Sequence, residues 1–311
     1  MRGETRIHMN IRISSGFRLF LISSPFLIAV FLFSYFPLYG WIYGFFDYRA
    51  GLKVFNTPFV GFKYFAMLVE NPITRGELIR VLRNTFAISF LGIITSPLPV
   101  LFAIFLLEIR SRIFQRLVQT LTTIPNFISW ILMFAVAWSI FSVGDGFLNR
   151  LLIQTGAIET EINFLASQDN VWLTMLAYST WKTLGWSAII YLAAIASIDQ
   201  EMYEAAKVDG AGRFHRIWHI TIPALIPTFF VLLLLSIANF INNGFEQYFV
   251  FQNPLNKEYI EVLDLYVYNQ GLLGGNIPYA TVVSMLKSVI SVVLLFVANA
   301  MSKAVRGESI I

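Results

Sequence analysis

Several residue spacings in this sequence match catalytic or metal-binding patterns. His215 and His219 are four residues apart, which would place two metal-binding rings on one face of a helix. However, Arg216 stands where a zincin carries its catalytic glutamate. The sequence contains no cysteine, which excludes thiolate metal sites and cysteine nucleophiles. We therefore expect no metal site in this chain.

Two serine–lysine pairs have the S-x-x-K spacing of acyl-enzyme nucleophiles: Ser179 with Lys182, and Ser284 with Lys287. Neither pair is accompanied by the other motifs of that class, and both lie in strongly apolar stretches. A phosphate-binding G-x-x-x-x-G-K-[ST] loop is also missing, so any ATP must be handled by another protein. We expect no catalytic residue and no cofactor bound by this chain, and it is not predicted to be an enzyme.

Polar groups inside apolar stretches indicate a different kind of chemistry. An ionised side chain at the centre of a bilayer costs about 2.5–3.5 kcal/mol on insertion scales, so such groups usually face a cavity or one another. The residues alone leave two interpretations open. Either the lysines pair with glutamate or reach the interface, or the groups form the polar wall of a translocation path. The candidate path residues are Lys182, Trp186, Asn239, Asn243, Glu246 and Lys287.

The composition indicates that apolar helices in a bilayer position these groups. Hydrophobic residues make up 57% of the 311, charged residues make up 13%, and the mean hydropathy is +0.68. A soluble domain carries about 25% charged residues, so this chain could not cover its surface with polar groups in water. The net charge of +4 is small. Its basic residues therefore inform topology, and we expect no nucleic-acid partner.

Six apolar stretches have roughly the 20 residues that cross a bilayer as a helix. They are long and not strictly alternating, which favours helices over the strands of a barrel. We predict an all-α membrane protein with six transmembrane helices in a single domain over 17–303, between tails at 1–16 and 304–311. The predicted spans are 21–46, 83–107, 117–142, 171–197, 222–246 and 279–303.

An even number of spans places both termini on one side of the membrane. The tails and loops on that side carry 12 basic and seven acidic residues, whereas the other side carries seven basic and ten acidic residues. Cytoplasmic loops are enriched in Lys and Arg, so we predict that both termini and the loops 108–116 and 198–221 are cytoplasmic. The loops 47–81, 143–170 and 247–278 are predicted to be external.

The loop between the fourth and fifth predicted spans has the pattern of a short capped helix. Asp199 is a good N-cap, and Glu201 is favourably placed in the first turn. We predict a helix over 200–209, ended by Gly210 in the left-handed conformation, and a membrane helix that restarts at Pro223. Such an element could dock in a groove of a partner, or it could lie as an amphipathic helix at the membrane interface.

The residue pattern of this loop resembles the EAA signature of ABC importer permease subunits. Gln200 departs from the proline often found at that position, which affects only how the helix starts. The resemblance implies that the loop is a coupling helix, which sits in a cleft of the ATP-hydrolysing subunit. The matching residues are Glu204, Ala205, Ala206, Asp209, Gly210, Ala211, Ile220 and Pro223.

Further motifs resemble the LplB-like subgroup of these permeases, which takes up oligosaccharides. They are the segments 35–40 and 60–65, Trp181-Lys182-x-x-Gly185, and Lys287-Ser288-Val289. The resemblance implies a multi-pass subunit of the bacterial cell membrane that forms half of a path for a sugar or oligosaccharide. It also implies a second permease subunit, two ATPase subunits that hold ATP and Mg, and an extracytoplasmic solute-binding protein.

Three alternatives stay open beside this interpretation. The first is a permease of the same class for another polar solute. The second is a membrane enzyme that acts on lipid or glycan, which would need a clustered nucleophile or carboxylate pair near an interface. The third is an ion channel, which should show a filter-like loop or a ring of charges.

Overall fold

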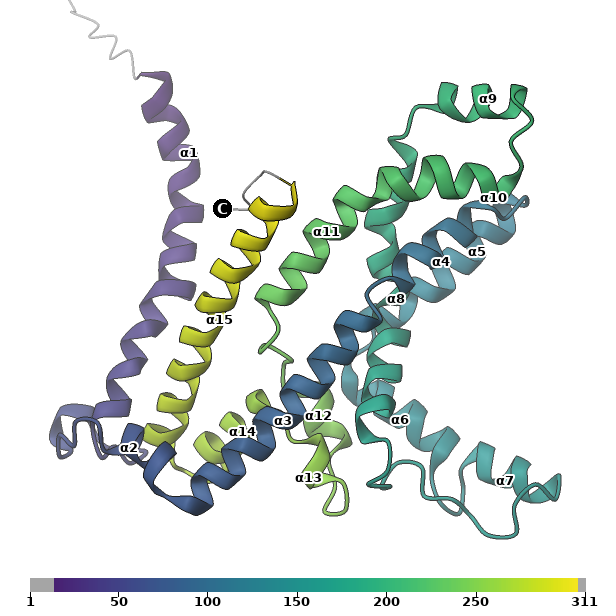
Figure 1. The fold of residues 1–311 in the computed structure, drawn as a ribbon. Helices are drawn as coiled ribbons and strands as arrows, with labels where there is room; N and C mark the ends of the chain where they lie inside the picture. Colours follow the sequence, from purple (N-terminus) through teal and green to yellow (C-terminus); the bar gives the residue numbers. More distant parts are fainter. Residues whose placement is uncertain (1–13, 307–311) are drawn as a thin grey trace, which may run out of the picture.

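The computed structural model describes residues 14–306, and that part of the chain is helical without β-strands (Figure 1). In the labels, α marks α-helices and η marks 3-10 or π turns. The first half comprises α1 Ser15–Val30, η1 Phe31–Tyr35, η2 Phe36–Phe45, η3 Val54–Asn56, α2 Lys63–Glu70, α3 Pro72–Ile94, α4 Leu98–Leu107, α5 Arg112–Thr123, η4 Ile124–Phe127, α6 Trp130–Phe141 and α7 Phe147–Gln154. The second half comprises α8 Val171–Ala196, α9 Gln200–Val208, α10 Arg213–Arg216, η5 Ile217–Thr221, α11 Ile222–Ala238, α12 Glu246–Phe251, α13 Lys257–Ile260, α14 Leu263–Tyr268, η6 Asn269–Leu273 and α15 Ile277–Arg306.

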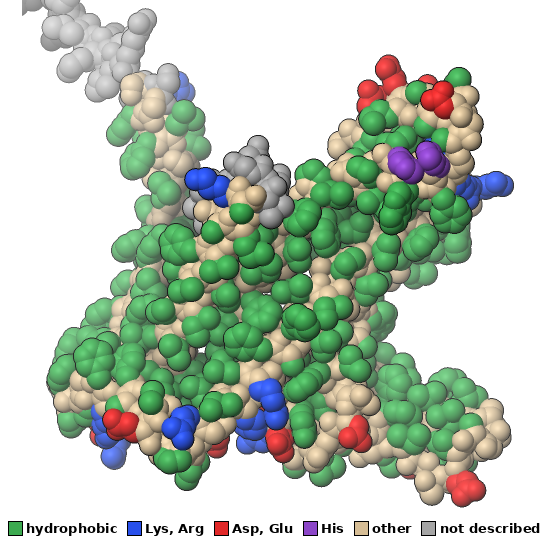
Figure 2. Space-filling view, in the orientation of Figure 1, with side chains coloured by type: hydrophobic (Ala, Val, Ile, Leu, Met, Phe, Trp, Pro, Cys, Tyr) green, Lys and Arg blue, Asp and Glu red, His purple; other side chains and the backbone are tan. Residues whose placement is uncertain are grey.

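Between four and six segments of this structure are long and apolar enough to cross a membrane. Four are continuous: Gly16–Phe45, Pro72–Leu107, Arg213–Ala238 and Ile277–Ala304. Two more are bent pairs, Arg112–Phe127 with Trp130–Phe141, and Val171–Ala196 with Gln200–Val208. Figure 2 shows hydrophobic side chains over the middle of the molecule and charged side chains toward its two ends. This distribution agrees with the prediction of an all-α membrane protein.

The predicted domain boundaries do not coincide with helix ends. Helix α1 already begins at Ser15, before the boundary at 16, and α15 continues to Arg306, beyond the boundary at 303. The remainder of the two predicted tails, 1–13 and 307–311, lies outside the described residues. The first turn of α1 and the last turn of α15 lie toward the same end of the molecule as α9 (Figure 1).

The third predicted span is not one straight helix. The prediction of a continuous span over 117–142 was wrong at its centre, because the chain bends by 110° between Phe127 and Trp130. Pro125 lacks an N–H, so α5 gives way to the 3-10 turn η4, and the helical run ends at Ile128, which has an extended backbone (φ −84°, ψ 133°). Ser129 then caps the second helix, since its Oγ accepts a hydrogen bond from the Leu132 backbone N–H at 3.4 Å.

The fifth predicted span is shifted toward the N-terminus. It was predicted over 222–246, but the continuous helix runs from Arg213 to Ala238. Pro223 does not restart it, because the π turn of η5 widens the helix just before the proline ring and relieves the usual clash. The chain leaves the helix at Asn239 and turns at Gly244, which has φ +71°.

The predicted loops 47–81 and 247–278 contain helices. Helix α3 begins at Pro72, where Asn71 caps it, so the second predicted span starts about ten residues early. The three short helices α12, α13 and α14 fill most of 247–278 and pack into the core. Their buried side chains include Tyr248, Phe251, Ile260, Leu263, Leu265 and Tyr266. Helices of four to six residues are too short for a search by span length to detect.

Two close helix contacts hold the long helices together. Helix α8 packs on α5 at Gly185, where an added Cβ would lie 2.3 Å from the carbonyl oxygen of Thr122. Segment η2 packs on α15 at Gly44, where an added Cβ would lie 3.0 Å from Cγ2 of Val282. Small residues at such contacts allow backbones to approach closely without side chains in between. Helix α1 extends beyond these contacts, and its described side chains are almost all exposed.

Candidate functional site

The helix predicted to couple to a partner is α9, which stands away from the other helices at one end of the molecule (Figure 1). Its start is capped as predicted, because the Asp199 Oδ1 atom accepts a hydrogen bond from the Glu201 backbone N–H at 3.0 Å. Its end is also as predicted, because Gly210 has φ +78°. The Ala211 N–H donates to the Ala206 carbonyl at 2.8 Å, and the Gly210 N–H donates to the Lys207 carbonyl at 3.1 Å. These two bonds close a Schellman turn.

The signature residues fall on three consecutive elements of this loop. Glu204, Ala205 and Ala206 lie on α9, while Asp209, Gly210 and Ala211 form the turn after it. Ile220 and Pro223 lie further along, on η5 and α11. The helix is attached to these elements by few contacts. One of them joins the Tyr203 hydroxyl to Thr221 Oγ1 at 2.9 Å.

The loop carries several large apolar side chains that are exposed. Met202 is 52% exposed, Val208 is 88% exposed, and Phe214 is 85% exposed. Ala205 is exposed beside them, whereas Ala206 is only half-exposed. Ala205 is therefore the more open of the two alanines of the signature. Exposed apolar side chains on a polar protein end commonly mark a docking surface.

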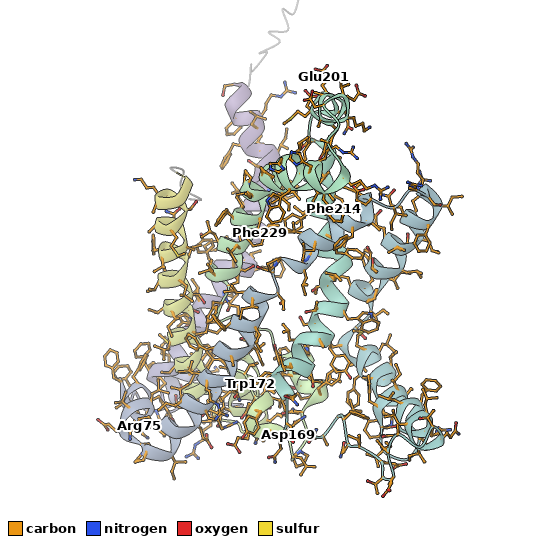
Figure 3. All side chains as sticks on the ribbon, turned by 45° about the vertical axis from the view of Figure 1, so that its right-hand side comes forward. Arg75, Asp169, Trp172, Glu201, Phe214 and Phe229 are labelled. Carbon is orange, nitrogen blue, oxygen red and sulfur yellow. The ribbon has the colours of Figure 1, made fainter. Side chains whose placement is uncertain are left out.

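A cleft opens between α3, α8 and α11 in the middle of the molecule, on the side where Phe229 is labelled in Figure 3. It consists of a cavity of about 530 Å³ and an adjoining cavity of about 470 Å³, and Gly92, Leu176 and Ser179 line both. Its hydroxyl-bearing lining residues are Ser89, Thr95, Ser96, Ser179, Thr180, Thr183, Ser187, Tyr191, Ser236 and Tyr248. A wall with this many hydroxyls can exchange hydrogen bonds with a polar solute.

The structure places four of the six predicted path residues on the walls of this cleft. Trp186 and Asn239 line the larger cavity, and Asn243 and Glu246 line the smaller one. The Trp186 ring is 49% exposed, so part of it is open to the cleft. The aromatic rings of Trp130 and Phe245 line the smaller cavity. Amides, a carboxylate and open rings therefore face one continuous space.

Lys182 has a different place from the other predicted path residues. Its side chain is buried against the bend between α5 and α6, and it lines neither cavity. The Nζ atom donates hydrogen bonds to the carbonyls of Pro125 and Asn126 at 3.0 and 3.1 Å, and also to the carbonyl of Ile128. These carbonyls end a helix, where a cation is favourable. Lys182 thus satisfies the backbone that Pro125 interrupts.

Lys287 is also paired with another side chain. Its Nζ atom forms an ion pair with Asp264 on α14, and this partner is not the glutamate considered from the sequence. The other carboxylate oxygen of Asp264 accepts a hydrogen bond from the Gly244 N–H at 2.8 Å. The pair therefore connects α15, α14 and the segment 239–245 that forms the floor of the smaller cavity.

Sequence reasoning missed the residues that hold this segment in place. Ser89 accepts a hydrogen bond from Asn243 Nδ2 at 2.8 Å and donates one to the Phe240 carbonyl at 2.5 Å. Asn242 Nδ2 donates to Ser291 Oγ at 3.3 Å. Ser89 lies 154 residues before Asn243, Asp264 lies 20 residues after Gly244, and neither belongs to a motif. No sequence signal could have identified them.

Two further groups complete the description of the site. Burial and the nearby Asp264 carboxylate raise the pKa of Tyr248, so its hydroxyl stays protonated at physiological pH. Within residues 14–306, no three His, Cys, Asp or Glu side chains gather into a possible metal site. The rings of His215 on α10 and His219 on η5 stack with their centroids 4.0 Å apart, and both side chains are exposed.

Similar proteins are known for nearly the whole chain. Protein LplB of Bacillus subtilis (strain 168) is 38% identical over 94% of this chain and 90% of its own length. The polygalacturonan/rhamnogalacturonan transport system permease protein YteP of the same organism is 36% identical, over 99% of this chain and 94% of its own. A crystal structure of a bacterial ABC transporter involved in the import of the acidic polysaccharide alginate contains a chain with TM-score 0.83 and 30% identity. The match covers 93% of this chain and 96% of that one.

The family assignment follows from these similarities together with a match over most of the described helices. Residues 90–307 match the family described as binding-protein-dependent transport system inner membrane component. The matched region contains the whole EAA loop, α9 and the cleft between α3, α8 and α11, apart from residues 72–89 of α3. The chain therefore belongs to this family, the multi-pass permease subunits of ABC transporters, and it is a transport subunit without an ATPase site of its own.

Proposed function

We propose that this chain forms half of the translocation path for a sugar or oligosaccharide in an ATP-driven importer. The observation that carries the proposal is the cleft lined by hydroxyls, amides and open aromatic rings. Sugar hydroxyls need hydrogen-bond partners, and the C–H faces of sugar rings pack on aromatic side chains. A path for transport must bind its solute weakly at several places, and a wall of many single hydroxyls suits that requirement.

The proposal includes the partners that such an importer needs. A second permease subunit would supply the other half of the path, and two ATPase subunits would hold ATP and Mg. A solute-binding protein would deliver the sugar from outside. A structure similar to this chain is of a bacterial alginate ABC transporter in complex with an alginate pentasaccharide-bound periplasmic protein, with TM-score 0.83 and 29% identity. That neighbour supports this set of partners.

Coupling to the ATPase would occur through α9. Its exposed apolar side chains and its weak attachment to the rest of the chain suit a helix that is completed by a partner. Closure of the two ATPase subunits would displace α9, and η5 and α11 would transmit the displacement to the cleft because they follow α9 directly in the chain. In this arrangement one ATP-driven movement changes the access to the cleft.

Uptake by the assembled complex tests the transport proposal. The chain is co-expressed with its partner permease, ATPase and binding protein, and a panel of labelled oligosaccharides is offered. We expect ATP-dependent uptake of at least one sugar, and we expect Asn243→Leu to reduce it while the complex still assembles. If only a non-sugar solute is taken up, the chain belongs to the same class but not to sugar transport. Uptake of the sugars at the same rate with and without ATP would contradict the proposal of an ATP-driven importer.

The proposal also includes the orientation, with both termini and α9 in the cytoplasm. The chain has no cysteine, so single cysteines can be placed at will. We expect Lys207→Cys to be protected from an impermeant thiol reagent in intact cells, and Glu159→Cys to be labelled. The external loop carries Glu159, which is exposed, and α9 carries Lys207, which is also exposed. The reverse labelling pattern would overturn the orientation.

A further inference from the structure

The cleft has an unusual charge balance. Among the described residues that line its two cavities, one carries a formal charge, and this residue is Glu246. Glu246 is exposed, and none of the ion pairs in the described part of the chain includes it. Among the described residues, the wall that this chain contributes therefore has one carboxylate and no cationic side chain.

The two lysines nearest to this region do not line the cleft, although the charge of Lys182 is close enough to attract the Glu246 carboxylate. Lys182 points its Nζ atom at three carbonyls of the bend between α5 and α6. Lys287 is neutralised by Asp264, and neither lysine lines a cavity. A buried cation that is already bonded cannot turn to a passing solute without leaving its partners unpaired. The positive groups that could attract an anion are thus committed elsewhere.

The cleft also contains an acceptor that needs a donor. The Asn243 Oδ1 atom is buried beside Glu246 and has no hydrogen-bond partner in the described part of the chain. Its amide orientation is fixed, because Nδ2 donates to Ser89 Oγ. A buried acceptor without a partner is rare and costs free energy until a donor reaches it. Sugar hydroxyls are such donors, whereas a uronate carboxylate at neutral pH has none.

Resting on the proposed function, we infer that Glu246 is a specificity-determining residue that favours uncharged, hydroxyl-rich sugar residues over uronates. The Glu246 carboxylate accepts hydrogen bonds from neighbouring hydroxyls, and Asn243 Oδ1 accepts another. A uronate brings a second negative charge toward Glu246, which is unfavourable. A relative of similar fold imports an acidic polysaccharide, so the fold admits anions and the discrimination must come from the wall.

A paired uptake experiment tests this inference. Each pair consists of a neutral oligosaccharide and the uronate oligosaccharide of the same length, such as galactose and galacturonate trimers. The complex contains the same binding protein throughout, so its own preference cancels when variants are compared. We expect Glu246→Lys to raise the uronate-to-neutral uptake ratio at least tenfold and Glu246→Gln to raise it less. Glu159→Lys makes the same charge change at an exposed site outside the cleft, and it should leave the ratio unchanged.

A second measurement reads the charge of the cleft without any sugar. Ser179 lines both cavities, so Ser179→Cys in the cysteine-free chain reports on the cleft. A cationic thiosulfonate should react faster than an anionic one of similar size. Adding Glu246→Gln should lower the cation-to-anion rate ratio roughly fivefold, as expected for the loss of one nearby charge. Adding Glu159→Gln should not change it.

The outcomes separate this inference from the function on which it rests. An unchanged uptake ratio in Glu246→Lys, in a complex that still transports, overturns the role of Glu246. If the complex with Glu246→Lys does not assemble, the uptake ratio of Glu246→Gln and the thiosulfonate rates test the inference. A cation-to-anion rate ratio that is the same with and without Glu246→Gln overturns it. If the wild-type complex imports neither member of any pair, the proposed sugar function fails, while the thiosulfonate rates still decide the sign of the wall.

Discussion

The α9 loop and the segment 239–245 are the two regions to which we assign coupling and solute passage, and they are held in opposite ways. The α9 loop keeps its shape through local bonds, with Asp199 at its start and Gly210 at its end. The segment 239–245 has no regular structure and is fixed by side chains on α3, α14 and α15. A locally built element can move as a unit, whereas a segment tied to several helices changes only when those helices move.

This contrast explains why one region could be predicted and the other could not. The cap, the turn and the signature residues of α9 are neighbours in sequence, so propensity and motif were sufficient. The position of Asn243 was predicted only as polar, because Ser89 and Asp264 reach it through the tertiary fold. The length of the apolar stretches identified the segments that can cross a membrane. It missed the bend at Pro125 and the short helices α12–α14, since both depend on packing rather than on length.

The largest expected effect comes from the contact that brings α8 against α5. Gly185→Ala places a Cβ where the Thr122 carbonyl lies at 2.3 Å, so two backbones must separate. We expect a loss of about 3 kcal/mol or more in stability, since neither side can yield. The measurement is thermal unfolding of the purified complex in detergent. Gly40→Ala is the control, because nothing lies within 4 Å of its added Cβ. Equal melting temperatures for both variants would contradict the close contact.

The second effect should appear only at the locally built region. Gly210→Asp puts a side chain into a left-handed position at a cost of about 1–2 kcal/mol, and Ala205→Trp adds bulk on the exposed face. Both should leave membrane insertion and the cleft intact but abolish ATPase co-purification and stimulated hydrolysis. Glu204→Lys, which reverses an exposed charge on the same helix, should weaken association less. Wild-type association in all three variants would remove α9 as the coupling element.

Comparison of Ala205→Trp with Ala206→Trp sharpens this test. Ala205 is exposed and Ala206 is half-buried toward the chain itself. We expect Ala205→Trp to block the ATPase directly, while Ala206→Trp distorts the turn at Ala211 whose N–H bonds the Ala206 carbonyl. Near-UV circular dichroism of the permease without ATPase should therefore change in Ala206→Trp more than in Ala205→Trp, after correction for the added tryptophan.

A smaller effect is expected when the tie between α14 and α15 is removed. Asp264→Asn leaves Lys287 without its ion partner, and Lys287→Met leaves Asp264 alone. Each should reduce uptake several-fold, and the double variant should be no worse than either single one. We expect a coupling free energy of about 1–3 kcal/mol from the stability of the four proteins. Strict additivity would show that the two side chains do not act together on the segment 239–245.

The smallest effect concerns the cap of α9. Asp199→Ala removes the acceptor for the Glu201 N–H, at a cost of about 1 kcal/mol to the helix. Because α9 has few contacts with the rest of the chain, we expect no change in the unfolding of the complex core. The ATPase affinity should fall about fivefold, as the partner must then order the first turn. Hydrogen exchange of residues 200–203 should rise in the variant, and uptake at saturating ATPase should stay normal.

The bend held by Lys182 has a consequence for how the protein is made. The Pro125 carbonyl also accepts the Ile128 N–H, but the carbonyls of Asn126 and Ile128 are made well before Lys182, which follows 56 residues after Asn126 in the chain. Carbonyls without partners in hydrocarbon are costly, so α5 and α6 cannot keep their 110° bend alone in lipid. The bend should therefore form only after α8 has been inserted, which makes the biogenesis of this half of the bundle cooperative and gives Lys182 an assembly role that precedes transport.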